Sequence, residues 1–262
     1  MAGEFACGCG LEYFLRVGVV ETMRIDIWSD VVCPFCYIGK RHLEAALADF
    51  EHSSTVEVVW HSFELDPTIP AEPTGSLSEV VAKKYNMTPE QADASQEDIA
   101  SRAAQVGLEF NWRNAKFGNT FNAHRLIHLA AAHGKQDQAE EALFRAYFTE
   151  EKNPAHREVL AEVAAKLELP ADEVAEVLDG DRYADEVRAD ETQAHQTGIT
   201  GVPFFVFDNK YAINGAQPTE VFASALERVW EENYAQPTQP NFISLKDNSA
   251  TEGGCCGPNG CA

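Results

Sequence analysis

Cysteines stand at both ends of the Cys-Pro-Phe-Cys motif at residues 33–36, and no other part of the sequence is better suited to do chemistry. An alternating apolar run before the motif predicts a strand, and apolar residues at helical spacing after it predict a helix. Pro34 suits the first turn of that helix. Cys33 would then lie at the helix N-terminus, where free N–H groups and the helix dipole favour a thiolate. Cys36 would follow one turn later on about the same face, so the pair could exchange with a disulfide.

The same spacing also occurs in zinc sites, but a structural zinc ion needs a second pair of ligands. The other five cysteines lie near the two chain ends, at Cys7, Cys9, Cys255, Cys256 and Cys261. This distribution favours redox chemistry over a metal site or a framework of disulfides. No metal and no other cofactor is expected.

Three more segments match sequence motifs of a known family, and they follow one another in the same order as in that family. They are residues 118–128 (Gly-Asn-Thr-Phe-Asn-Ala-His-Arg-Leu-Ile-His), residues 198–205 (Gly-Ile-Thr-Gly-Val-Pro-Phe-Phe) and residues 213–218 (Ile-Asn-Gly-Ala-Gln-Pro). With the cysteine motif, they make the chain resemble the FrnE-type branch of the DsbA-like thiol–disulfide oxidoreductases, within the thioredoxin superfamily. The resemblance extends over residues 23–234.

The resemblance assigns roles to residues outside the cysteine motif. Val202-Pro203 matches the cis-proline loop, and the Val202 backbone would pair with a substrate chain beside Cys33. Asn122 and His124 would shape a substrate groove where the helical part faces the site. Four aromatic residues could line that groove or pack in the core: Trp112, Phe117, Phe121 and Phe148.

His124 and His128 are four residues apart on a predicted helix, a spacing that can hold zinc. No third ligand is apparent, and the neighbouring residues are apolar. Packed or hydrogen-bonded histidines are therefore the favoured interpretation.

The fold class follows from the order of the predicted elements. A strand, a helix and a second strand at residues 55–63 imply a parallel pair, and residues 204–207 and 211–214 read as a hairpin. A final helix after Pro218 carries an apolar stripe: Val221, Phe222, Ala225, Leu226, Val229 and Trp230. Between them the chain is rich in helix formers. We predict an α/β fold, a thioredoxin-like core with a large all-helical insertion.

This division gives four segments. Residues 23–75 and 198–234 form the discontinuous thioredoxin-like domain, and residues 76–197 form the helical insertion. Residues 1–22 are expected to be a leader or added residues outside the fold. Residues 235–262 are expected to be a flexible tail because they are rich in Gly, Pro, Asn and Ser. Cys256 and Cys261 in the tail bracket a Gly-Pro-Asn-Gly turn and are a candidate auxiliary redox pair, with metal capture as the alternative.

Composition limits the partners. The formal charge of −22 over 262 residues argues against nucleic acid and against an anionic membrane surface, and it predicts a solvated acidic exterior. No signal peptide and no apolar segment of about 20 residues is present, so a cytoplasmic location is expected. Cytosolic disulfides are usually transient and catalytic.

The sequence thus predicts a protein disulfide reductase or isomerase working by mixed-disulfide exchange. Its partners would be disulfide-containing proteins and a thiol reductant such as glutathione or a thioredoxin system. The motif lacks the histidine found between the cysteines of strongly oxidising relatives, which predicts a less oxidising pair. The first alternative is a glutathione-dependent isomerase or transferase, like 2-hydroxychromene-2-carboxylate isomerase or the kappa-class transferases, which carry a serine at the Cys33 position. The second is a non-catalytic holdase that binds unfolded chains.

Overall fold

The computed structural model describes residues 22–235. This part of the chain contains four strands and nine α-helices, together with two short 3-10 turns at Ser53–Thr55 and Trp112–Asn114. The strands are β1 (Met23–Ser29), β2 (Val56–Ser62), β3 (Phe204–Phe207) and β4 (Tyr211–Asn214). The helices are α1 (Pro34–Asp49), α2 (Leu77–Tyr85), α3 (Pro89–Gln105), α4 (Phe121–Ala132), α5 (Gln136–Phe148), α6 (Arg157–Lys166), α7 (Ala171–Asp179), α8 (Ala184–Gln196) and α9 (Thr219–Asn233).

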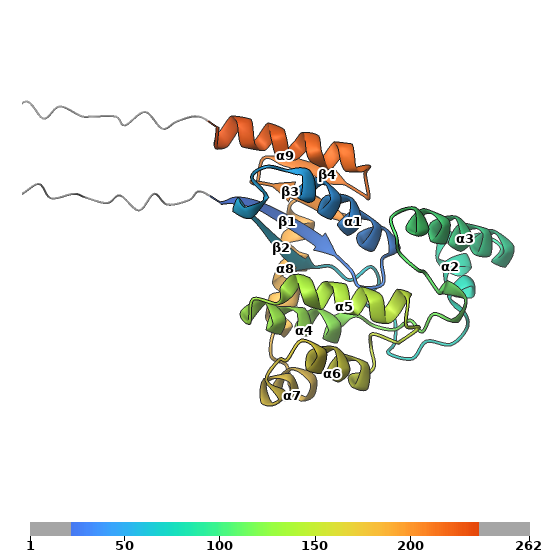
Figure 1. Ribbon diagram of the computed structural model, residues 1–262. Coiled ribbons are helices and arrows are strands. Elements are labelled where there is room, and N and C mark those ends of the chain that lie inside the picture. Colours follow the sequence, from blue (N-terminus) through green and yellow to red (C-terminus); the bar gives the residue numbers. More distant parts are fainter. Residues whose placement is uncertain (1–21, 236–262) are drawn as a thin grey trace, which may run out of the picture.

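The sheet has the strand order β2-β1-β3-β4 (Figure 1). β1 and β2 are parallel, with Met23 opposite Val56, as the strand–helix–strand pattern predicts. β3 is antiparallel to both β1 and β4. The α/β class and the thioredoxin-like core with much helix are therefore confirmed, as is the predicted hairpin.

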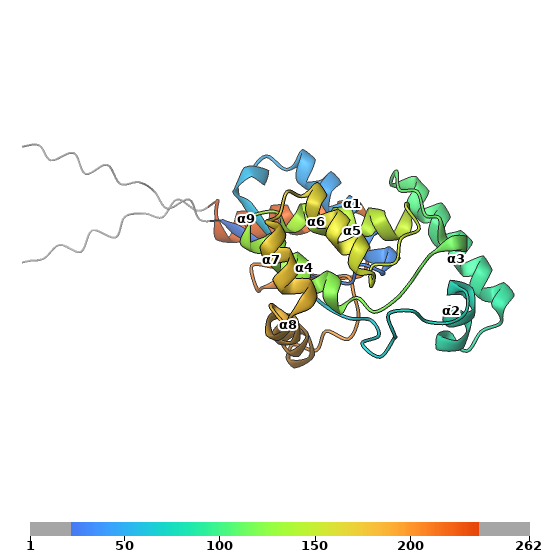
Figure 2. The ribbon, with the colours of Figure 1, turned by 90° about the horizontal axis from the view of Figure 1, so that it is seen from below.

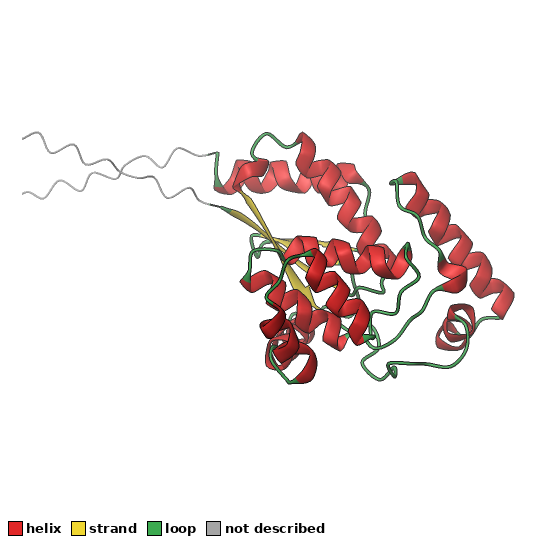
Figure 3. Cartoon of the chain, turned by 60° about the horizontal axis from the view of Figure 1, so that its bottom comes forward, coloured by secondary structure: helices red, strands yellow, loops and turns green. Residues whose placement is uncertain are grey.

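The two faces of the sheet carry different side chains, because successive residues of a strand point to opposite sides. Met23, Ile25 and Ile27 pack with residues of α1 and α9 in one apolar core. Trp28 and Phe204 lie in another cluster that includes residues on and just after α8. Figure 3 shows the strands held between these groups of helices.

The stripe predicted on α9 is only partly right. Phe222, Leu226 and Val229 are fully buried against the sheet, but Val221 is 40% exposed. Adjacent helical residues are about 100° apart, so Val221 faces away when Phe222 faces the sheet.

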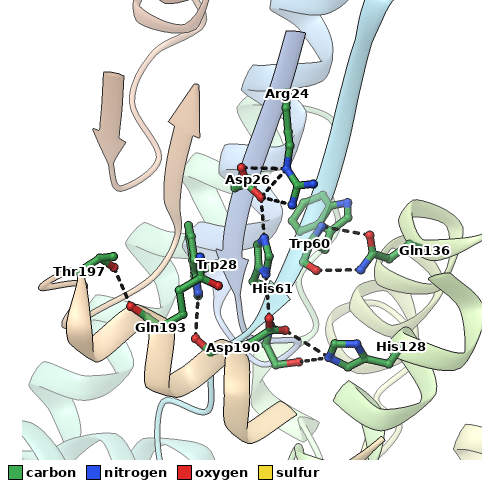
Figure 4. Close-up of polar contacts among 11 residues, drawn as sticks. Arg24, Asp26, Trp28, Trp60, His61, His128, Gln136, Asp190, Gln193 and Thr197 are labelled. Atoms are coloured by element: carbon green, nitrogen blue, oxygen red, sulfur yellow. Dashed lines mark hydrogen bonds and ion pairs between the residues drawn. The ribbon is translucent and has the colours of Figure 1, made fainter. Parts of the chain in front are cut away.

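The face of the sheet opposite α9 also holds a polar network, which joins β1 and β2 to α4 and α8 (Figure 4). His61 on β2 is hydrogen-bonded to Asp26 on β1 and to Asp190 on α8. His128 on α4 lies 3.2 Å from the Asp190 carboxylate and 3.1 Å from the Ser62 hydroxyl. His128 therefore belongs to this network as a hydrogen-bonded histidine.

All helices from α2 to α8 lie between β2 and β3 in the chain. Capping boxes begin α2 at Ser76 and α3 at Thr88, and Pro89 occupies the first turn of α3. Seen from below, α4–α8 form one group, whereas α2 and α3 project to one side (Figure 2). α3 lies beside α1, the helix that follows the cysteine motif.

The two ends of the described chain lie together. The Tyr234 hydroxyl donates a hydrogen bond to the Thr22 carbonyl, 3.2 Å away. Both ends lie on the side of the molecule opposite α2 and α3 (Figure 1). None of the helices from Pro34 to Asn233 is long and apolar enough to cross a membrane.

Candidate active site

Cys33 is the N-cap of α1, and Pro34 occupies the first helical position, as the sequence predicts. The turn after β1 is fixed by backbone hydrogen bonds, because the Cys33 N–H donates to the Asp30 carbonyl (2.9 Å). The Cys33 carbonyl in turn accepts from the Cys36 N–H (3.1 Å) and starts the helix. Both cysteines are free thiols and nearly inaccessible, with 3% and 1% of their surfaces exposed.

Val202 and Pro203 come from the other end of the chain and meet this turn. The peptide bond between them is cis. The Cys33 Sγ lies 3.6 Å from the Val202 carbonyl oxygen, in a position to donate a hydrogen bond to it. The Pro203 carbonyl accepts a hydrogen bond from the Gly215 N–H (2.9 Å), which ties the loop to the end of β4.

Gly39 allows α1 to lie close to this loop. A Cβ atom at Gly39 would stand 3.0 Å from the Phe205 ring and 3.4 Å from the Pro203 ring. A side chain at this position would therefore push α1 away from β3 and from the loop that holds Val202. The structure brings Cys33, Cys36, Val202 and Pro203 together.

The surroundings of Cys36 keep it protonated. Burial raises the pKa of the Cys36 thiol well above its ordinary value, and the neighbouring Cys33 raises it further. The nearby Asp30 backbone and Ser29 side chain lower the pKa of Cys36, but the net shift is upward. Cys36 is thus suited to react after Cys33, within the protein, and not as the first nucleophile.

An apolar cavity of about 160 Å³ opens beside Pro34. Its lining residues come from the active-site turn, the loop after β2, α2, the segment before α4 and the end of α5: Asp30, Val32, Pro34, Leu65, Asp66, Ile69, Leu77, Val80, Val81, Lys84, Tyr85, Phe117, Gly118, Thr120, Tyr147 and Phe148. Phe117 and Phe148, two of the four predicted aromatic residues, thus lie at the site. Trp112 and Phe121 do not line this cavity, since each stacks with arginine side chains elsewhere.

His124 and Asn122 do not line the cavity beside Pro34 either. His124 is 1% exposed, and its Nε2 lies 3.4 Å from the Asp30 carboxylate. Asn122 accepts a hydrogen bond from Arg125 at 2.9 Å. The structure therefore places His124 beneath the active-site turn and directs Asn122 along α4.

Buried ionisable groups that the sequence analysis missed surround His124. Burial lowers the pKa of His124, but the neighbouring Asp30 carboxylate outweighs it, and the net shift is upward. Glu140 on α5 is 1% exposed, and burial raises its pKa to about 8. The Asp30 and Glu140 carboxylates and the His124 ring each leave one buried polar atom without a hydrogen bond. No local sequence pattern could have identified this group, because Asp30, His124 and Glu140 lie far apart in the sequence, in a turn, in α4 and in α5.

Between residues 22 and 235, no group of three or more His, Cys, Asp or Glu side chains is arranged to hold a metal ion. Cys7, Cys9, Cys255, Cys256 and Cys261 lie outside the described residues. The auxiliary pair Cys256–Cys261 therefore stays a prediction.

Comparison with known proteins decides the family. Residues 24–227 match the family described as the DSBA-like thioredoxin domain. The chain belongs to this family.

Two sequence relatives support this assignment. A probable DsbA oxidoreductase from Streptomyces coelicolor is 42% identical, and its crystal structure matches with a TM-score of 0.77 over 92% of this chain and 98% of that chain. The uncharacterized protein YwbO of Bacillus subtilis (strain 168) is 30% identical over 209 residues, which are 78% of this chain and 96% of the relative.

A more distant structure shares the fold. The cytosolic disulfide reductase DsbM from Pseudomonas aeruginosa matches with a TM-score of 0.55 and 19% identity, over 80% of this chain and 99% of that chain. DsbM has also been solved with GSH, and that structure matches with the same TM-score of 0.55.

Proposed function

We propose that this protein reduces or isomerises disulfides in other proteins through Cys33 and Cys36, as a FrnE-type member of its family. The observation that carries the proposal is the position of Cys33, at the N-cap of α1 and 3.6 Å from the Val202 carbonyl. A helix N-terminus stabilises negative charge on sulfur. A backbone segment beside the thiol offers a place for an extended substrate chain.

The reaction has two exchange steps. The Cys33 thiolate attacks one sulfur of a substrate disulfide, forms a mixed disulfide and releases the other sulfur as a thiolate. Cys36 then loses its proton and attacks the Cys33 sulfur, which releases the second substrate thiolate and leaves a Cys33–Cys36 disulfide. The substrate gains two electrons, and a thiol reductant returns two electrons to the Cys33–Cys36 pair. In isomerisation, the released thiolate attacks a second disulfide of the same substrate, and the thiolate freed there displaces Cys33 from the mixed disulfide. Cys33 leaves as a thiolate, and the substrate's disulfides are rearranged without net electron transfer.

Other residues have supporting roles in this proposal. Val202 and Pro203 position the substrate backbone, and the cavity beside Pro34 takes an apolar part of the substrate. His124 supports the active-site turn from beneath through its contact with Asp30, and Asn122 supports α4 through its hydrogen bond from Arg125. Cys256 and Cys261 would pass electrons between the Cys33–Cys36 pair and a donor.

The direction of the reaction follows from the motif. Pro34 and Phe35 stand between the cysteines where strongly oxidising relatives have a histidine, so the pair is expected to be less oxidising. This suits reduction in the cytoplasm, and we propose glutathione or a thioredoxin system as the reductant. The shared fold with DsbM, a cytosolic disulfide reductase solved also with GSH, is compatible with this choice.

The proposal is tested by insulin reduction driven by dithiothreitol. Cys33→Ser should abolish activity, and Cys36→Ser should accumulate a mixed disulfide that mass spectrometry detects. A variant with Cys255, Cys256 and Cys261 changed to Ser is the matched control that keeps the motif. Wild-type protein without activity on insulin or on peptide disulfides would refute the proposal and favour the glutathione-dependent isomerase.

A further inference from the structure

Arg102 on α3 differs from the other arginines of residues 22–235. The chain has 20 basic and 42 acidic residues, so carboxylate partners are plentiful. Each of the other arginines in this part of the chain pairs with a carboxylate or donates to a backbone carbonyl: Arg24, Arg41, Arg113, Arg125, Arg145, Arg157, Arg182, Arg188 and Arg228. Among the described residues, Arg102 has no hydrogen bond and no ion pair. Within residues 22–235 it is thus an unpaired cation, which we call the free cation.

This free cation lies at the cysteine motif. The Arg102 guanidinium carbon is 5.1 Å from the centre of the Phe35 ring, and Phe35 stands directly between Pro34 and Cys36. Phe35 is half-buried, whereas Arg102 is exposed. α3 thus brings a positive charge to the residue that lies between Pro34 and Cys36 of the motif.

The charge acts along the surface of α1. His42 lies seven residues after Phe35 and so about on the same helix face. Burial lowers the pKa of His42, the Arg102 charge lowers it further, and Glu220 on α9 opposes them. The field of Arg102 therefore extends over the surface that begins at the cysteine motif.

Stacking on Phe35 prepares the guanidinium for a ligand. A cation over an aromatic face is stabilised there, while its N–H donors remain available for a planar acceptor. A carboxylate can accept two parallel hydrogen bonds from such a group. Within the described residues no carboxylate accepts from this group, so its donors are open to an acceptor on another molecule.

We propose that Arg102 binds a carboxylate of the substrate, so that the enzyme prefers disulfides with a carboxylate close to the reacting sulfur. The inference rests on the proposed function and names its substrate class. Such a carboxylate occurs in an acidic residue beside a cysteine of a polypeptide and also in glutathione disulfide. Arg102 would hold it while Cys33 forms the mixed disulfide.

The first test compares two reagents that attack the same thiol. Iodoacetate carries a carboxylate and iodoacetamide does not. The rate of Cys33 alkylation by iodoacetate divided by the rate with iodoacetamide therefore reports the local charge. A change in the thiolate fraction affects both rates equally and cancels in this ratio. The rates are measured on the reduced full chain by mass spectrometry of the Cys33 peptide. Arg102→Gln should lower the ratio about three- to tenfold, and Arg102→Lys, which keeps the charge, should lower it less.

Arg157→Gln is the control, because it removes the same charge from an exposed site on α6. Its ratio should equal that of the wild type. An equal ratio in wild type and Arg102→Gln would overturn the inference.

The second test uses turnover. Values of kcat/KM are compared for a peptide disulfide with Asp beside cysteine, its Asn counterpart, and glutathione disulfide. Wild type should prefer the Asp peptide over the Asn peptide by about three- to tenfold, and Arg102→Gln should lose this preference. Loss of glutathione disulfide reduction alone would identify that molecule as the source of the carboxylate.

The two proposals fail in different ways. Active wild-type protein without a preference for carboxylates would overturn the role of Arg102 and leave the oxidoreductase function standing. A wild type that turns over no disulfide would refute the proposed function, and the alkylation ratio would still decide whether Arg102 attracts anions.

Discussion

His61 gives the fold a dependence on pH that can be measured directly. Its Nε2 lies 2.7 Å from the Asp26 carboxylate, and its Nδ1 lies 2.8 Å from the Asp190 carboxylate (Figure 4). The ring also stacks on Trp28, with a distance of 4.5 Å between the ring centres. Burial lowers the pKa of His61, but the hydrogen bonds and charges of Asp190 and Asp26 outweigh it and raise it to about 9. The imidazolium is therefore the stable form at neutral pH.

The size of the effect follows from the shift. An unperturbed histidine has a pKa of about 6.5, and each unit of difference corresponds to about 1.4 kcal/mol. Because the folded pKa is the higher one, the contribution is fully present below pH 6.5 and is lost as the pH rises through about 9. Between pH 6 and pH 9.5 the free energy of unfolding should lose about 3 kcal/mol from this residue.

The assay is unfolding by urea at pH 6 and pH 9.5, followed by tryptophan fluorescence. The decrease in unfolding free energy between these values should be about 3 kcal/mol smaller in His61→Gln than in wild type. His195→Gln, which changes an exposed histidine of α8, should behave as wild type. Other groups titrate equally in all three proteins and cancel. Equal decreases in wild type and His61→Gln would refute the assignment of a buried imidazolium.

Three further changes test how the core and the site are held. Gly39→Ala should destabilise the fold by about 1–3 kcal/mol and slow insulin reduction, because its Cβ would press on Phe205; unchanged thermal unfolding would contradict this. Glu140→Gln should gain about 3 kcal/mol over wild type as the pH rises from 5 to 8. Over this range the Glu140 carboxyl is ionised in the unfolded chain but stays protonated in the fold, where its pKa is about 8, so the wild type loses stability and the glutamine variant does not. Parallel urea curves would show that Glu140 is not buried in its neutral form. Gln136→Ala should cost about 1–3 kcal/mol in the same urea assay, since the Gln136 amide both accepts from and donates to the Trp60 backbone at the open edge of β2.

Local patterns were enough to predict the position of the cysteines. The apolar alternation before residue 30 and the proline at residue 34 determine where the strand ends and the helix begins, so Cys33 could be placed at the N-cap. The helices between β2 and β3 could be predicted from helix formers and from capping residues such as Thr88. The approach of Val202-Pro203 to Cys33 required the family resemblance, because 169 residues separate the two atoms in contact.

Contacts made by the docking of the insertion could not be predicted. Arg102 meets Phe35, and His124 meets Asp30, only because α3 and α4 pack against the active-site end of α1 and β1. Sequence periodicity gives the buried face of a helix but not its partner. His124 is 1% exposed, which agrees with the packed histidine favoured from its apolar neighbours, and its groove role stays a prediction.

The acidic composition has a second role besides the predicted solvated exterior. Most acidic residues of the described chain lie at the surface, but Asp26, Asp30, Glu64 and Glu140 are buried. Burying a carboxylate is costly unless it is paired, protonated or hydrogen-bonded. Asp26 has His61 and Arg24, Glu64 has Arg188 and Asn119, and Glu140 avoids the cost by its raised pKa.

The buried acids explain why a free cation at the active site is informative. Buried carboxylates already occupy basic partners such as Arg24 and Arg188, and an acidic surface supplies many more acceptors. Arg102 has no such partner among residues 22–235, and its guanidinium lies over the Phe35 ring instead. The helices between β2 and β3 supply Arg102, His124 and Glu140, so most of the ionisable groups around the two thiols come from these helices. The active-site turn and α1 hold the thiols, and under the proposed role of Arg102 the helix α3 supplies the charge that a substrate carboxylate meets beside them.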